Sequence, residues 1–122
     1  PGTWTGKRST GFSAFQVVDF AVLNQTSGTN LTIVIGNRLG KTINMTDINA
    51  TLRGTACTFG ITSTNLAPNG RTTQSKICNG SSAWGAPLAK GTAYSVYVDI
   101  IYIDPDSSLT HLDSGTLSAS VE

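Results

Sequence analysis

The chain has 122 residues, enough for one domain with one hydrophobic core. Hydrophobic residues make up 39% and charged residues 12%, a balance that excludes an intrinsically disordered chain. The net charge is +1 and the basic residues form no stripe that could follow a phosphate backbone, so nucleic acid is not expected as a partner.

Strong helix formers are scarce, because Thr, Ser, Gly and Asn fill 52 positions and Glu122 is the only glutamate. No apolar run approaches the roughly 18 residues of a membrane-spanning helix, so the chain as given is not expected to contact a membrane. We expect one domain over residues 1–122, in which residues 1–11 form an extended N-terminal arm or linker.

Alternating apolar and polar residues predict β-strands. The first strand covers residues 15–23 and is followed by an Asn/Ser/Gly turn over residues 24–30. Residues 31–35 complete a hairpin and place one leucine and two isoleucines on the same face. Further on, Ile43 and Met45 share one parity and the apolar residues of 48–52 share the other, which predicts a β-bulge near Thr46-Asp47.

The second half of the chain alternates less regularly. Residues 56–61 predict a strand, residues 62–73 a long polar loop, Lys76–Cys78 a return to the sheet, and residues 80–87 an irregular segment. The strongest strand covers residues 92–103. It places Tyr94, Val96, Val98 and Ile100 on one face, and both faces are expected to be at least partly covered. A turn at residues 104–108 and a closing strand at residues 115–121 follow. About seven short strands predict an all-β fold, a single β-sandwich of the immunoglobulin-like or pilin-head type.

The two cysteines, Cys57 and Cys78, lack the C-x-x-C spacing of a metal or redox site, and each lies beside a predicted strand. One structural disulfide is the favoured interpretation, with two reduced, buried thiols as the alternative. Closing a loop of this size would stabilise the fold by roughly 3 kcal/mol and is typical of a small domain in an oxidising compartment.

Asn-x-Ser/Thr sequons are numerous and predict glycosylation on an extracellular surface. The five candidate acceptors are Asn24, Asn30, Asn44, Asn49 and Asn79.

Catalytic apparatus is not expected. His111 is the only histidine and lies in a segment that is predicted to be a loop. Ser107, Ser108, Asp113 and Ser114 are nearby in the sequence, but no nucleophile motif accompanies them. We therefore predict an exposed or structural histidine and a protein that is not an enzyme and has no cofactor.

A calcium site is also not expected. Asp104, Asp106 and Asp113 bracket one turn, yet their spacing matches no EF-hand loop and includes no bidentate glutamate. A solvated acidic turn without a metal ion is the favoured interpretation.

Aromatic side chains could stack on sugar rings, as in small carbohydrate-binding modules. Tyr94 and Tyr97 belong to a strand that is predicted to be buried, so we expect them to pack in the core. Trp84, in a Gly/Pro-rich segment, is the better candidate for a ligand contact at the surface.

Two blocks of sequence carry a resemblance to a known family. They are Gly11–Phe20 followed by Leu31–Ile48, with its Gly36-Asn37-Arg38-Leu39-Gly40 turn, and the closing block from Tyr94 to Leu117. Together they resemble archaeal type IV pilin-like and archaellin-like proteins. The resemblance implies a β-rich head that follows a cleaved signal and a long hydrophobic helix, and that helix is not among the 122 residues given.

The resemblance implies a structural subunit of an extracellular, cell-surface archaeal filament of the pilus or archaellum kind. Such a subunit would self-associate through its N-terminal segment or by strand exchange, with residues 11–23 or 116–121 as the donor. The alternative is a secreted binding module or adhesin that recognises carbohydrate or a surface-layer protein.

Overall fold

The computed structural model describes residues 7–25, 28–78 and 89–122, and these form an all-β structure of two antiparallel sheets. The strands are β1 (Arg8–Thr10), β2 (Phe15–Gln25), β3 (Gly28–Asn37), β4 (Ile43–Leu52), β5 (Thr55–Thr58), β6 (Thr64–Leu66), β7 (Arg71–Cys78), β8 (Ala93–Asp104) and β9 (Leu109–Ser120). None of the described residues forms a helix that could cross a membrane.

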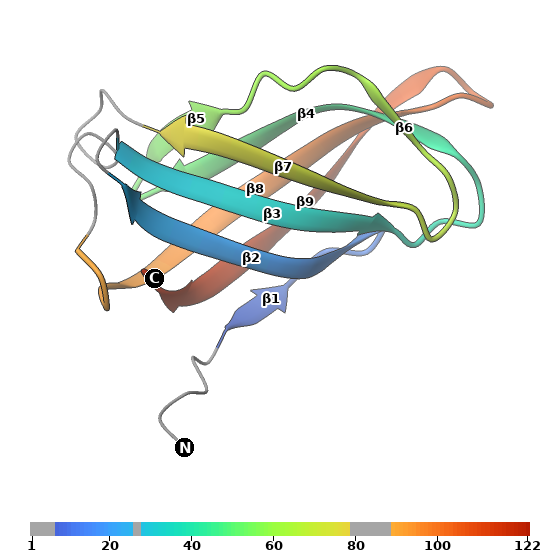
Figure 1. Cartoon of the computed structure of the whole chain (residues 1–122). Helices are drawn as coiled ribbons and strands as arrows, with labels where there is room; N and C mark the ends of the chain where they lie inside the picture. The colour runs from blue at the N-terminus through green and yellow to red at the C-terminus, as the bar shows by residue number, and fades with distance from the viewer. Residues whose placement is uncertain (1–6, 26–27, 79–88) are drawn as a thin grey trace.

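The two sheets face each other as a β-sandwich, which confirms the predicted fold class (Figure 1). The larger sheet has the order β1-β9-β8-β4-β5, with β6 also paired to β4, and the smaller sheet has the order β2-β3-β7. The described residues form nine strands where about seven were expected, and two of the nine, β1 and β6, are only three residues long.

The predicted hairpin of residues 15–35 is confirmed. β2 and β3 pair antiparallel from Phe15 opposite Asn37 to Gln25 opposite Gly28. Leu31, Ile33 and Ile35 are all fully buried, as their shared parity predicted.

The predicted bulge in β4 is confirmed as well, because the register against β8 shifts between Met45 and Asp47. Asp47 stabilises the bulge: its Oδ1 accepts hydrogen bonds from the backbone N–H groups of Ile48 at 2.8 Å and Gly60 at 3.0 Å. The extra residue lets Ile43 and Met45, and then the apolar residues from Ile48 to Leu52, all face the same core.

The expected long loop over residues 62–73 is wrong, since β6 lies within it and β7 begins at Arg71. β6 is too short to show a period and buries only Leu66, and the half-buried positions of β7 hold Thr72 and Gln74 rather than apolar residues. The side chain of Asn37 ties the end of β6 to the β3–β4 connection, because its amide donates to the carbonyl oxygens of Leu66 at 2.9 Å and Lys41 at 2.8 Å.

The hairpin of β8 and β9 is the longest in the molecule, and the strands pair from Ala93 opposite Ser120 to Asp104 opposite Leu109. Tyr94, Val96, Val98 and Ile100 are buried. The expectation that Tyr97 packs in the core is wrong: it lies on the outward face of the strand and is 47% exposed. The loop expected around His111 is also wrong, because that residue lies within β9.

The predicted disulfide is confirmed between Cys57 and Cys78, with a Cα–Cα distance of 5.9 Å and a sequence separation of 21. Cys57 belongs to β5 of the larger sheet and Cys78 ends β7 of the smaller sheet. The bond therefore joins the two sheets covalently across one side of the core.

Candidate functional site

One edge of the larger sheet is only partly covered. β9 pairs with β8 along its whole length, but on its other side it pairs only through Thr116, Leu117 and Ser118, which lie opposite β1. In the part of the chain that the structure describes, residues 109–112 have no strand on that side. We call this four-residue segment the bare β9 edge.

Two apolar side chains mark the bare β9 edge. Leu109 and Leu112 are each 60% exposed, more than the other exposed large hydrophobic side chains, which are Val18, Ile77 and Tyr97. Because the two leucines are three positions apart in a strand, they project from opposite faces of the sheet. The segment thus combines an open strand edge with apolar side chains above and below it.

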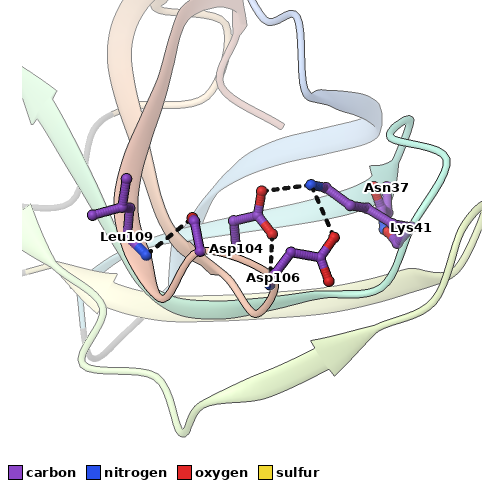
Figure 2. A network of polar contacts seen from close by, with 6 residues as sticks. Asn37, Lys41, Asp104, Asp106 and Leu109 are labelled. Atoms are coloured by element: carbon purple, nitrogen blue, oxygen red, sulfur yellow. Dashed lines mark hydrogen bonds and ion pairs between the residues drawn. The ribbon is translucent and has the colours of Figure 1, made fainter.

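The tip of the β8–β9 hairpin is held by an ionic network. Figure 2 shows the ammonium of Lys41, from the β3–β4 connection, between the carboxylates of Asp104 and Asp106, at 2.5 Å and 3.5 Å. The hydrogen bond from Lys41 holds the pKa of Asp104 below its ordinary value and raises the pKa of Lys41 itself.

The turn has its own hydrogen bonds. The backbone N–H of Asp106 donates to Asp104 Oδ1 at 2.9 Å, and that of Leu109 donates to Ser107 Oγ at 3.2 Å (Figure 2). Ser108, with φ +60, completes the turn in the left-handed region. These contacts fix the point at which the bare β9 edge begins.

Aromatic contacts attach the same hairpin to the smaller sheet. The rings of Tyr102 and His111 stack with centroids 5.3 Å apart, and Tyr102 meets Phe15 of β2 edge to face at 5.1 Å. Burial is the main cause of the raised pKa of Tyr102. His111, which belongs to the bare β9 edge, therefore packs on a partly buried tyrosine.

Asp113 serves a structural purpose that the sequence reasoning missed. Its carboxylate is 5% exposed and accepts hydrogen bonds from the backbone N–H groups of Ser13, Ala14 and Phe15, each at 3.0 Å. This buried anion ties the start of β2 to β9. A signal was present, because Asp113 shares the parity of Leu117 and Val121 and so falls on the core face of the closing strand.

The residues considered for a catalytic triad do not converge. His111 and Asp113 share one face of β9, whereas Ser114 has the opposite parity and donates to Asp99 Oδ1 at 2.6 Å. The carboxylate of Asp113 is occupied by the backbone amides of β2.

The three aspartates weighed as calcium ligands are also separated. Asp104 and Asp106 pair with Lys41, and Asp113 lies in the buried amide pocket. Among the described residues, no group of three or more His, Cys, Asp or Glu side chains is arranged to hold a metal ion.

The described sequons lie on outward faces of strands. Asn44 and Asn49 alternate with buried residues of β4, and Asn30 alternates with buried residues of β3, so all three point away from the core. Asn24 belongs to β2, but its side chain is not described. Asn79 and the candidate ligand contact Trp84 lie outside the described residues.

No protein-family model matches the chain, and no curated protein is similar to it.

Proposed function

We propose that this domain is a structural subunit of an extracellular archaeal filament, pilus-like or archaellum-like, and that its head associates with neighbouring copies. The observation that carries the proposal is the bare β9 edge with Leu109 and Leu112, each 60% exposed. An open strand edge with exposed apolar side chains is the type of surface to which another chain adds by strand pairing.

The geometry suits a contact between subunits. A strand laid against residues 109–112 would satisfy backbone groups that face solvent, and its side chains would pack against one leucine on each face of the sheet. Burying the exposed part of each leucine would contribute about 1–2 kcal/mol. The ionic network of Lys41 and Asp104 holds the hairpin in place before the contact forms, which lowers the ordering cost of association.

Two further observations agree with a role outside the cell. The disulfide between the sheets is typical of proteins that function in an oxidising environment. The sequons at Asn30, Asn44 and Asn49 lie on outward faces, where glycans would not disturb the core. Intact-mass measurement of the native protein, and of Asn→Gln variants at each sequon, would identify the occupied positions.

The test is a pair of charge substitutions in the bare β9 edge. In cells that express the full protein, Leu109→Lys with Leu112→Lys should remove filaments from negatively stained preparations. Val18→Lys is the control, because Val18 is an exposed apolar residue in the other sheet. Filaments of normal number and length in the double variant would contradict the proposal.

A second candidate function is a secreted binding module or adhesin for carbohydrate or a surface-layer protein. It is favoured by Tyr97, whose ring is half exposed on the outer face of the larger sheet and could stack on a sugar. A monomeric protein that binds glycans, and loses binding in Tyr97→Ala or Trp84→Ala, would support this function over the filament.

A further inference from the structure

The N-terminal arm, defined here as residues 7–10, is held to the domain without contributing to its core. All three residues of β1 are exposed, and the strand pairs only with Thr116–Ser118 of β9. Detaching the arm would expose that stretch of the β9 edge but would uncover no buried side chain of β1 itself.

The chain is held far more firmly just beyond the arm. Phe12 packs against Gly115 so closely that a Cβ on Gly115 would meet the ring at 2.5 Å. The next three residues donate their backbone N–H groups to the buried carboxylate of Asp113. The firm attachment therefore begins at Phe12.

Gly11 lies at the boundary between the two regions. Its φ of +96 lies in the region that favours glycine, and a Cβ there would meet the Cα of Gly115 at 3.0 Å and the carbonyl oxygen of Ser114 at 3.2 Å. A glycine between an exposed arm and an anchored segment can change its backbone angles with little steric cost, so it can act as a hinge.

Lys7, the first residue of the arm, makes the side-chain contacts that hold the arm to the domain. Its ammonium pairs with Glu122 at 2.8 Å and Asp19 at 3.4 Å, and lies 5.8 Å from the centre of the Phe20 ring. Both carboxylates are accessible from solvent. A lysine from another copy could reach the same three groups.

We propose that the N-terminal arm is exchanged between copies of this chain: the arm of one copy pairs with Thr116–Ser118 of the next, and Gly11 is the hinge. This inference rests on the proposed function and adds a second contact between copies, next to the bare β9 edge. The exchanged arm would make the same contacts with the next copy that it makes within its own chain. The exchange therefore requires no new complementary surface.

Whether the exchange is one-way or mutual determines which assembly forms. When each copy gives its arm to the next, one arm and one β9 edge remain free at the two ends, and the chain of subunits can grow. Two copies that exchange arms mutually would form a closed dimer instead. An open series agrees with a filament.

Two variants that each add one cysteine to the chain test the exchange, because Thr10 and Thr116 lie directly opposite each other in the register of β1 and β9. Thr10→Cys and Thr116→Cys would be produced in the same cells, and the material would be oxidised mildly. We expect a covalent dimer that contains one chain of each kind, identified by the mass of the linked peptides. Thr10→Cys with Thr73→Cys is the control, because Thr73 is exposed in β7 of the other sheet, and it should give no dimer above background.

The outcomes separate the exchange from the filament. A mixed dimer supports the exchange even if no filament is seen, in which case the filament role fails. The exchange would be overturned by normal filaments without a mixed dimer, if a variant that carries both Thr10→Cys and Thr116→Cys closes its new disulfide within a single chain. The filament role would then remain intact. Absence of both dimer and filament would overturn both proposals.

Discussion

Gly115 of β9 lies directly against the ring of Phe12, and the contact leaves no room for a side chain at position 115. A Cβ there would stand 2.5 Å from the Cδ2 and Cε2 atoms of Phe12 and would also meet the carbonyl oxygen of Thr10. The absence of a side chain on Gly115 therefore allows the segment before β2 to cross β9 and dock on it.

Gly115→Ala should destabilise the fold by about 1–3 kcal/mol, because the phenylalanine ring and the backbone of Thr10 must both move away. Urea-induced unfolding would measure the loss. Gly40→Ala is the matched control, since a Cβ at Gly40 meets no atom within 4 Å. Equal effects of the two substitutions would show that the contact with Phe12 contributes nothing to stability.

Asp113→Asn should cost about 2 kcal/mol of folding free energy, because the amide replaces one acceptor oxygen with a donor that faces the backbone N–H groups of β2. Thermal and urea unfolding would both report the loss. Asp99→Asn serves for comparison: Asp99 accepts from the hydroxyl of Ser114, and an asparagine oxygen can still do so. A variant at Asp113 as stable as the original chain would disprove the anchoring role of this carboxylate.

Asp104→Asn should be less stable than the original chain at neutral pH. The difference in unfolding free energy between the two proteins should become smaller as the solution is acidified. The hydrogen bond from Lys41 holds the pKa of Asp104 below its ordinary value of 3.8. A lowered pKa contributes stability that is present above pH 3.8 and is lost as the pH falls through the folded-state value. Urea unfolding of both proteins between pH 2 and pH 7 would test this.

At high pH the stabilising contribution of the same ion pair is lost when Lys41 gives up its proton. The pKa of Lys41 is raised above its ordinary value of 10.5, mainly by the hydrogen bond with Asp104, so its contribution is lost only as the pH rises through that raised value. A stability difference between the two proteins that is the same at pH 2 and pH 7 would contradict the assigned role of the pair.

Tyr94→Phe should leave the fold unchanged in structure and about 1 kcal/mol more stable. The hydroxyl of Tyr94 is buried and makes no well-formed hydrogen bond with the described residues, and its burial raises the pKa of the side chain. Tyr97→Phe is the control, because that hydroxyl belongs to an exposed ring and its removal should change little. A clear loss of stability in Tyr94→Phe would mean that the hydroxyl has a partner, for which the backbone of Val22 is the candidate.

Hydrophobic parity predicted the parts of the fold that build the core. The change of parity between Met45 and Ile48 predicted the bulge of β4, and the even-numbered residues from Tyr94 to Ile100 predicted the buried face of β8. These predictions succeeded because one face of each strand meets the other sheet, and burial there demands apolar residues at every second position.

Strands at the edges were harder to predict. β7 alternates between exposed and half-buried positions that hold threonine and glutamine, and residues 109–112 are exposed on both faces, so neither segment has a hydrophobic period. The bare β9 edge was missed for the same reason that makes it a candidate contact surface: its two leucines do not enter the core of their own chain. The anchoring of Ser13–Phe15 by Asp113 depends on a contact across about 100 residues, which local patterns do not encode.

The disulfide between β5 and β7 also has a mechanical consequence. A subunit within a filament would be pulled and bent by its neighbours, and tension applied at β9 would enter the larger sheet first. Because Cys57 and Cys78 connect that sheet to the smaller one by a covalent bond, the tension passes between the layers without depending only on the contacts of the core. At that side the two layers cannot slide apart.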